Sequence, residues 1–383
     1  MTDDAPRHTT TALTRRLEGL RERARIPALA AVVARQGSAP RLASVGRVDP
    51  RASDPATLDT VFAWYSITKI VTACVALRLA ESGFLDLDAP VSETVPQVAP
   101  LVRGRGPTPR DLLCHGGGFV DRQMHVARWF RQPGDPWPDP REFLAVQLSR
   151  HGRLKREPRQ ALHYSNLGFA LLGECLAAAG GLPFRQLVRD EVLDPLGCVA
   201  TGFEGAAIPE GRQAVGLLPR WSTMGLAVAM VGRGRFTTGR LAGVEGAGRS
   251  PTFGSQSVVR WRDLVFSAHG GLLGPISDLA RLVDAFVQGG APLLDPESVA
   301  AMGELVLAEG AGAGRTRGTG LGFFIDLEPQ GLPGRGRLLS HGGRGPGFTT
   351  EFFWLPEAGM GVGVLGSGSF DCKAVARALL LEA

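Results

Sequence analysis

A chain of 383 residues with 44% hydrophobic and 21% charged residues is long enough for one large two-lobed unit or two domains with a sizeable core. The 52 glycines and 27 prolines indicate many loops but fall short of the share that marks a low-complexity chain. The formal charge of +5 comes almost entirely from arginine, and no basic stripe interleaved with aromatic residues points to nucleic-acid binding.

No apolar run approaches the roughly 20 residues of a membrane-spanning helix. Residues 1–12 lack the basic start, apolar stretch and cleavage site of a secretory signal, so we expect a cytoplasmic protein that does not bind membranes. The five cysteines are scattered, odd in number and never spaced C-x-x-C, which favours reduced thiols over disulfides or a zinc site. We expect no metal and no cofactor.

The elements expected from the sequence place strands near both ends of the chain and helices in between. Alternating or β-branched runs between turn residues predict strands over 27–35, 41–48, 60–65, 320–327, 348–355 and 361–365. Helical spacing and stop signals predict helices over 11–26, 67–82, 141–150, 167–179, 270–290 and 371–381, with one more that begins at Pro109. The helix over 67–82 is apolar on most sides, so we expect it in the interior.

This order predicts two lobes. A discontinuous α/β lobe would combine residues 1–84 and 266–383, and a mainly helical lobe would be inserted over 85–265. Because ligand sites tend to lie in clefts between lobes, we expect the active site there.

The first candidate for chemistry is Ser66, three residues before Lys69 at the start of the apolar helix. Positions i and i+3 share a helix face, so the lysine can reach the hydroxyl, and burial would lower its pKa enough to make it a base. Free N–H groups at the helix start would stabilise developing negative charge. Taken alone, the motif also fits a helix-capping serine with a lysine that extends to solvent.

The second candidate is Tyr164-Ser165-Asn166, which precedes another apolar stretch. A tyrosine hydroxyl near a lysine can shuttle a proton, and an asparagine amide offers a donor and an acceptor to a substrate amide or ester. A loop tyrosine whose neighbours cap a helix is the alternative.

The third candidate is the glycine-rich segment from Ser340 to Phe348. Glycines let the backbone approach a ligand closely, and an exposed row of N–H groups can bind an oxyanion. A tight hairpin with an incidental histidine is the alternative.

Together, the three motifs resemble the class C β-lactamase family. S-x-x-K at 66–69, Y-x-N at 164–166 and H-G-G at 341–343 occur in that family's order, and residues 108–118 resemble its T-x-x-x-L-L-x-H-T-S-G segment. The resemblance implies a β-lactamase/transpeptidase-like fold, in which an antiparallel sheet is flanked by helices and carries an inserted helical lobe. The family also holds penicillin-binding proteins, D-stereospecific peptidases, esterases and acyltransferases.

By this resemblance, Ser66 is the nucleophile, and Lys69 with Tyr164 forms the base and proton-relay pair. Which of the two takes the first proton stays open. The backbone N–H groups of Ser66 and Arg344 would form the oxyanion hole. The implied substrate-binding and oxyanion positions are Asn166, His341, Gly343 and Arg344.

His341 marks the main departure from the family pattern. β-Lactamases and D,D-peptidases of the family usually have Lys-Thr-Gly or Lys-Ser-Gly at this place, where the lysine helps to hold the substrate carboxylate. The resemblance implies that His341 can instead hydrogen-bond the Tyr164 hydroxyl, and Arg344 could partly replace the missing cation. H-G-G is closer to esterases, acyltransferases and amidases.

These observations favour a cytoplasmic serine hydrolase of esterase or amidase type, which acts on a small-molecule ester, amide or acyl donor through a Ser66 acyl-enzyme. The alternative is a transacylase that hands the same acyl group to an amine or alcohol in small-molecule biosynthesis. The basic stretch from Arg150 to Arg159 would then receive an anionic substrate or carrier. Further alternatives are a β-lactamase or D-stereospecific peptidase, and a non-catalytic binding relative.

Overall fold

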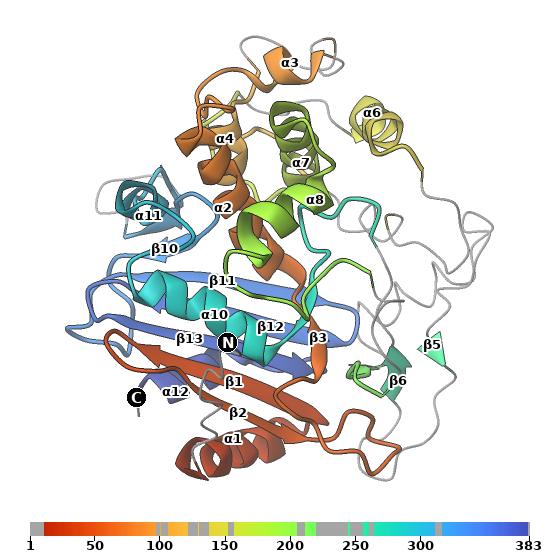
Figure 1. Cartoon of the computed structure of the whole chain (residues 1–383), viewed down its shortest axis with the longest axis vertical. Coiled ribbons are helices and arrows are strands. Elements are labelled where there is room, and N and C mark those ends of the chain that lie inside the picture. Colours follow the sequence, from red (N-terminus) through yellow and green to blue (C-terminus); the bar gives the residue numbers. More distant parts are fainter. Residues whose placement is uncertain are drawn as a thin grey trace, which may run out of the picture.

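The centre of the computed structural model is an antiparallel sheet of eight strands (Figure 1). In spatial order they are β2 (Arg41–Gly46), β1 (Ala28–Arg35), β13 (Met360–Ser367), β12 (Phe348–Leu355), β11 (Leu338–Gly345), β10 (Phe324–Asp326), β9 (Arg317–Thr319) and β8 (Leu307–Ala308). The structure describes residues 11–96, 100, 106–121, 129, 138–151, 157–204, 211–219, 244–245, 256–259, 264–310 and 316–381.

Different helices cover the two faces of this sheet (Figure 1). α1 (Thr11–Ala24) and α12 (Cys372–Leu381) pack on one face, and α10 (Ile276–Val287) packs on the other. Side chains alternate along a strand, so on β12 Phe353 joins the cluster beneath α1 and α12, while Phe352 joins the larger cluster on the α10 side. We refer to these sides as the α12 face and the α10 face.

The remaining elements belong to a helical layer and two small sheets. The helices are α2 (Thr68–Glu81), α3 (Val91–Thr94), α4 (Pro109–Leu113), α6 (Pro140–His151), α7 (Asn166–Gly180), α8 (Phe184–Val188) and α11 (Pro296–Met302). A π-helical turn, Arg189–Leu193, continues α8. The small sheets pair β3 (Val61–Ala63) with β7 (Leu273–Pro275), and β6 (Gln256–Val259) with both β4 (Gly216–Pro219) and β5 (Val244–Glu245).

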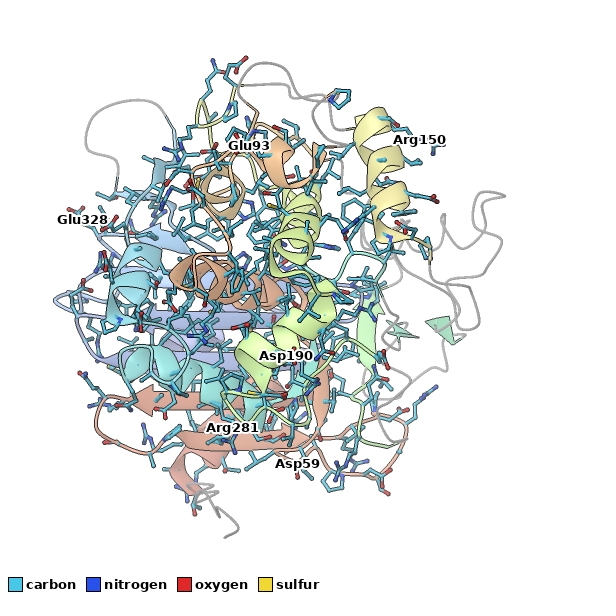
Figure 2. All side chains as sticks on the ribbon, turned by 45° about the horizontal axis from the view of Figure 1, so that its top comes forward. Asp59, Glu93, Arg150, Asp190, Arg281 and Glu328 are labelled. Atoms are coloured by element: carbon cyan, nitrogen blue, oxygen red, sulfur yellow. The ribbon has the colours of Figure 1, made fainter. Side chains whose placement is uncertain are left out.

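α2 is the buried helix that the sequence predicts over 67–82. Eleven of its fourteen residues are buried, and it packs against α7 and α8. Because hardly any of its surface meets water, its sequence is apolar on most sides. Figure 2 shows the contrast with charged residues such as Arg150 and Glu328, whose side chains lie at the outside of the molecule.

Three predictions about local structure are wrong in detail. The turn expected in the glycine-rich segment 340–348 is limited to residues 346 and 347, because residues 340–345 belong to strand β11, where pairing with β12 stabilises a sequence of low strand propensity. The helix expected over 270–290 begins only at Ile276, since residues 273–275 pair with β3. The strand expected over 320–327 is reduced to β10 at its centre, because residues 320–323 form the bend that connects β9 to β10.

The lobe boundaries at residues 84 and 266 stay a prediction, although the sheet of β4, β5 and β6 adds strands to the segment expected to be mainly helical. All five cysteines are buried free thiols. No single helix in the described ranges is long and apolar enough to cross a membrane; a bent pair, Asn166–Gly180 with Phe184–Leu193, meets the criteria of length and composition only when taken together.

Candidate active site

Ser66 lies at the turn between β3 and α2, within a short 3-10 turn, Tyr65–Ile67. Among residues 61–70 it is the one that is not buried. Its neighbour Tyr65 has a φ of 46°, a left-handed conformation that costs free energy for a bulky residue. A sharp turn of this kind presents the Ser66 hydroxyl away from the packed segment on either side.

Contacts with strand β11 hold Tyr65 in this conformation. Its hydroxyl donates to the carbonyl of Pro346 at 2.7 Å. A Cβ atom at Gly345 would overlap the Tyr65 ring, and one at Gly343 would overlap the carbonyl oxygen of Trp64 and the hydroxyl of Thr350. The glycines of the third motif therefore let β11 lie directly against the turn that carries Ser66, rather than only against a ligand.

Lys69 is completely buried and reaches three oxygen atoms. Its Nζ lies 3.3 Å from Ser66 Oγ and donates to Asn166 Oδ1 at 2.9 Å and to the carbonyl of His269 at 2.6 Å. Burial lowers the pKa of Lys69 well below its usual value, and the charge of Asp121 partly opposes that shift. A neutral Lys69 amine has two hydrogens, which it donates to Asn166 and His269, so its lone pair is free to face Ser66 Oγ.

Tyr164 approaches the same oxygen from the other side. Its hydroxyl donates to Ser66 Oγ at 2.7 Å, and its ring lies 4.8 Å from Lys69 Nζ. Desolvation raises the pKa of the phenol, while the hydrogen bond to Ser66 opposes that effect. Tyr164 is therefore a neutral donor at the nucleophile, not a tyrosinate.

Asn166 is the first residue of α7, and Ser165 is its N-cap, whose Oγ accepts from Gly168 N at 2.8 Å. The bond between Asn166 and Lys69 uses the amide oxygen, so the amide NH2 stays available as a donor to a substrate. The structure thus brings together four residues that sequence reasoning selected: Ser66, Lys69, Tyr164 and Asn166.

Sequence reasoning missed Asp121 and gave His115 no role. The Asp121 carboxylate accepts from Ser165 Oγ at 2.8 Å, from Asn166 N and from Leu167 N at 3.1 Å. His115 Nδ1 accepts from Ser165 N at 3.3 Å, and its ring centroid lies 4.4 Å from that of Tyr164. Neither contact follows from motif spacing, because both join segments more than forty residues apart.

His341 lies on β11 with its side chain on the α10 face, because it pairs with Phe352. Its ring centroid is 6.1 Å from that of Tyr164, yet Nε2 is buried without a hydrogen-bond partner among the described residues. The expected bond from His341 to the Tyr164 hydroxyl is thus not formed; that hydroxyl donates to Ser66. Burial and then Lys69 lower the pKa of His341 to about 3, so the imidazole is neutral.

Arg344 has its side chain on the α12 face, since it pairs with Thr349, two residues from Glu351 and four from Phe353 on that side. The expectation that its guanidinium could replace a cation in the site is therefore wrong. The backbone N–H of Arg344 has another orientation than its side chain. Gly345 and Phe348 flank a two-residue turn and form a hydrogen-bonded pair, so the N–H of Arg344 points away from β12.

Among the described strands that N–H has no pairing partner, because β10 pairs with β11 only up to Ser340. The backbone orientation is the one that an oxyanion donor beside Ser66 requires. The described part of the chain contains no group of three or more His, Cys, Asp or Glu residues that could hold a metal ion. What the arrangement can do is transfer an acyl group to Ser66 with the help of one amine and one phenol.

Comparisons with known proteins show the family of the chain. A family model described as Beta-lactamase matches residues 13–383. Esterase EstB from Burkholderia gladioli is 29% identical over 370 residues, which cover 91% of this chain and 87% of that esterase. D-alanyl-D-alanine-carboxypeptidase/endopeptidase AmpH from Escherichia coli K12 is 32% identical over 162 residues, 42% of this chain, so the match spans only 41% of the length of AmpH.

Solved structures share the fold at low sequence identity. D-amino acid amidase from Ochrobactrum anthropi SV3, complexed with L-phenylalanine, gives a TM-score of 0.75 at 21% identity, with 97% of this chain and 98% of the amidase covered. The octameric penicillin-binding protein homologue from Pyrococcus abyssi gives 0.74 at 22% identity, covering 96% of this chain and 77% of that one.

The expected β-lactamase/transpeptidase-like fold, with its antiparallel sheet flanked by helices, is confirmed. The family model extends over nearly the whole sequence, and the relatives that match include esterases, amidases and carboxypeptidases. The chain therefore belongs to the Beta-lactamase family.

Proposed function

We propose that this protein is a serine hydrolase of esterase or amidase type, which cleaves a small, uncharged ester or amide through an acyl-enzyme on Ser66. One observation carries the proposal: Ser66 Oγ lies 3.3 Å from Lys69 Nζ and 2.7 Å from the Tyr164 hydroxyl. A serine hydroxyl becomes a good nucleophile only when a base takes its proton, and a leaving group departs only when an acid protonates it. Lys69, the candidate base, and Tyr164, the candidate acid, both lie next to Ser66 Oγ.

Desolvation favours the neutral form of both partners, the buried Lys69 and the partly exposed Tyr164, and this is the pair that the reaction needs. Desolvation lowers the pKa of Lys69 and raises the pKa of Tyr164. We therefore assign the first proton transfer to Lys69. As Ser66 Oγ attacks the carbonyl carbon, its proton moves to the lysine amine, and the carbonyl oxygen becomes an oxyanion that accepts from the N–H groups of Ser66 and Arg344.

The tetrahedral intermediate then collapses. The Tyr164 hydroxyl protonates the leaving alcohol or amine as the bond to the acyl carbon breaks, and the proton on Lys69 restores the phenol. In the second half of the cycle, water attacks the acyl-enzyme, gives its proton to the same pair and releases the acid with Ser66 regenerated. Every proton that enters this sequence leaves with a product.

The proposed preference for an uncharged substrate rests on His341 and Arg344, the two residues of β11 that could carry a positive charge. His341 is neutral because its pKa falls to about 3, and Arg344 carries its guanidinium on the α12 face. A substrate carboxylate next to β11 would thus meet no fixed positive charge from either residue. Because a charge-assisted hydrogen bond contributes about 1.5–3 kcal/mol, its absence lowers affinity for penicillin-like acids by about ten- to hundredfold.

The relatives support the ester and amide classes without selecting between them. Esterase EstB matches nearly the full length of this chain, and D-amino acid amidase has the same fold. Whether water or another nucleophile takes the acyl group depends on the acceptor, so the transacylase hypothesis stays an alternative.

A fluorophosphonate probe followed by intact-mass measurement tests the nucleophile. We expect one adduct on the wild type and none on Ser66→Ala. A wild type without adduct, or equal labelling of both proteins, would exclude a Ser66 acyl-enzyme.

A substrate panel then tests the class. We expect short-chain nitrophenyl esters or N-acetylated D-amino-acid amides, which are uncharged, to be turned over at least about tenfold faster than a chromogenic cephalosporin, which carries a carboxylate. Faster cephalosporin turnover would contradict the proposed preference. Acyl transfer to added amines or alcohols, detected as new products by mass spectrometry, would favour the transacylase.

We also propose a reducing compartment, the cytoplasm, as the location of this protein. The proposal is supported by five free cysteines, all of them buried. Fractionation of cells that express the full-length gene is the test, and recovery in an extracellular or periplasmic fraction would contradict it.

A further inference from the structure

Asp121 lies behind the catalytic residues and has no part in the mechanism given above. We infer that Asp121 is a positioning residue: it fixes the backbone that carries Tyr164 and Asn166, and it supplies the negative charge that faces Lys69. The inference rests on the proposed function, because it concerns the same Ser66 centre.

The first support is geometric. Asp121 Oδ1 accepts from Ser165 Oγ at 2.8 Å, and Oδ2 accepts from Asn166 N and from Leu167 N at 3.1 Å. Ser165 and Asn166 directly follow Tyr164, so one carboxylate holds the segment on which both the phenol and the substrate amide depend. Small displacements matter here, since a shift of about 1 Å at a catalytic group can cost about a hundredfold in rate.

The chemistry of its three partners makes the carboxylate the acceptor in all three contacts. Ser165 Oγ already accepts from Gly168 N at 2.8 Å, so its own hydrogen points to Asp121. The other two contacts are backbone N–H donors. Burial raises the pKa of Asp121, and the three hydrogen bonds oppose this effect because they favour the ionised form, which accepts all of them. An amide in its place would turn an NH2 group toward at least one donor.

The second support is the hydrogen-bonded path from Asp121 to the nucleophile. Asp121 binds Asn166 N, Asn166 Oδ1 accepts from Lys69 Nζ at 2.9 Å, and Nζ lies 3.3 Å from Ser66 Oγ. The charge of Asp121 raises the pKa of Lys69 against the larger effect of burial. The other titratable groups that Lys69 influences or touches are Tyr164, His115, His269 and His341.

Those other groups do not supply a negative charge. Burial lowers the pKa of His115 and of His269 well below the usual value and that of His341 to about 3, so the three imidazoles are neutral. The raised pKa of Tyr164 keeps the phenol neutral. The Asp121 carboxylate is thus the anion whose charge acts on Lys69 in the described part of the chain.

Asp121→Asn separates a positioning role from a merely structural one. We expect kcat to fall by about tenfold to a hundredfold with a smaller change in KM, because the catalytic segment shifts while Ser66 stays in place. The acid limb of the kcat/KM profile should move to lower pH by at least about 0.3 unit, since Lys69 loses a neighbour that favours its ammonium form. Fluorophosphonate labelling of Ser66 should slow in parallel.

Two further variants keep the charge and therefore test the hydrogen bonds of Asp121 separately from its charge. Asp121→Glu should lower activity but leave the acid limb at its wild-type pH. Ser165→Ala removes one of the three hydrogen bonds, and we expect a smaller fall in kcat with no shift of the limb. If Asp121→Asn fails to fold, these two variants still decide the positioning role, and wild-type kcat in both would overturn it.

Asp278 provides a matched control. Its carboxylate is also buried and accepts from Ala200 N at 2.9 Å and Thr201 Oγ1 at 2.8 Å, but it lies on α10 and touches no catalytic residue. Asp278→Asn should lower the melting temperature without moving the acid limb. A folded Asp121→Asn with wild-type kcat and limb would overturn the inference while the wild type is still labelled; an unlabelled wild type would instead overturn the proposed function and the inference with it.

Discussion

The side chains of Arg344 and Glu351 share the α12 face of the central sheet, the side turned away from Ser66. Arg344 pairs with Thr349, and Gly342 pairs with Glu351, so the acid lies directly behind the strand that borders the active site. Glu351 is 2% exposed, and its Oε1 has no hydrogen-bond partner among the described residues. Burial raises the pKa of Glu351 to about 8, against the opposing effects of Lys373 and Arg344.

This pKa makes stability depend on pH. Between the ordinary pKa of a glutamate and about 8, the unfolded chain releases the Glu351 proton while the folded chain keeps it, so unfolding becomes easier as pH rises. We expect Glu351→Gln to remove this loss, which amounts to a few kcal/mol at most. The check is urea unfolding from pH 5 to 8.5: curves that stay parallel for the two proteins would contradict a raised pKa.

Tyr164→Phe removes the acid that protonates the leaving group and keeps the ring. We expect acylation to slow by about a hundredfold or more, with the thermal midpoint little changed. Single-turnover kinetics with a nitrophenyl ester measure this step directly. A wild-type rate would mean that the proton relay does not pass through the phenol.

Lys69→Arg tests the requirement for a neutral amine. Burial lowers the pKa of Lys69, so activity should rise as pH increases through that lowered value, well below the usual lysine range. An arginine stays charged throughout, and its variant should lose the limb together with nearly all activity. Retained activity with an unchanged profile would exclude Lys69 as the base.

Gly343→Ala tests the close approach of β11 to the turn at Ser66. The new Cβ would overlap the Thr350 hydroxyl and the Trp64 carbonyl, so we expect a loss of about 1–3 kcal/mol in stability together with lower kcat. Gly19→Ala is the control, because Gly19 lies within α1, where a Cβ meets only Arg23 Nη1 at 3.8 Å, and should stabilise the protein by up to about 1 kcal/mol. Equal stability of both variants, measured by urea unfolding, would contradict the steric argument.

Local geometry explains which parts of the site could be predicted. Ser66 and Lys69 are one helical turn apart, so their proximity follows from spacing alone. The proximity of Tyr164 and Asn166 to this pair was predictable only from the order of the motifs. No physical rule joins residues about a hundred positions apart in the sequence.

Other features depend on tertiary contacts. The face on which Arg344 lies follows from strand register, and the glycine-rich sequence of residues 340–348 does not show where the strand ends and the turn begins. Asp121 sits after a run of glycines and apolar residues, and its partners are 44 to 46 positions away. No periodicity connects such segments, because the link is made when the loop packs on the start of α7.

The buried cysteines have a practical consequence for work on this protein. Burial raises the pKa of the Cys114 and Cys175 thiols to about 11 and that of the other three as well, so none is a thiolate near neutral pH. The native protein should consequently react with no maleimide at pH 7. A single cysteine introduced at an exposed site, such as Val199→Cys, can then carry one fluorophore or spin label without first removing the natural thiols.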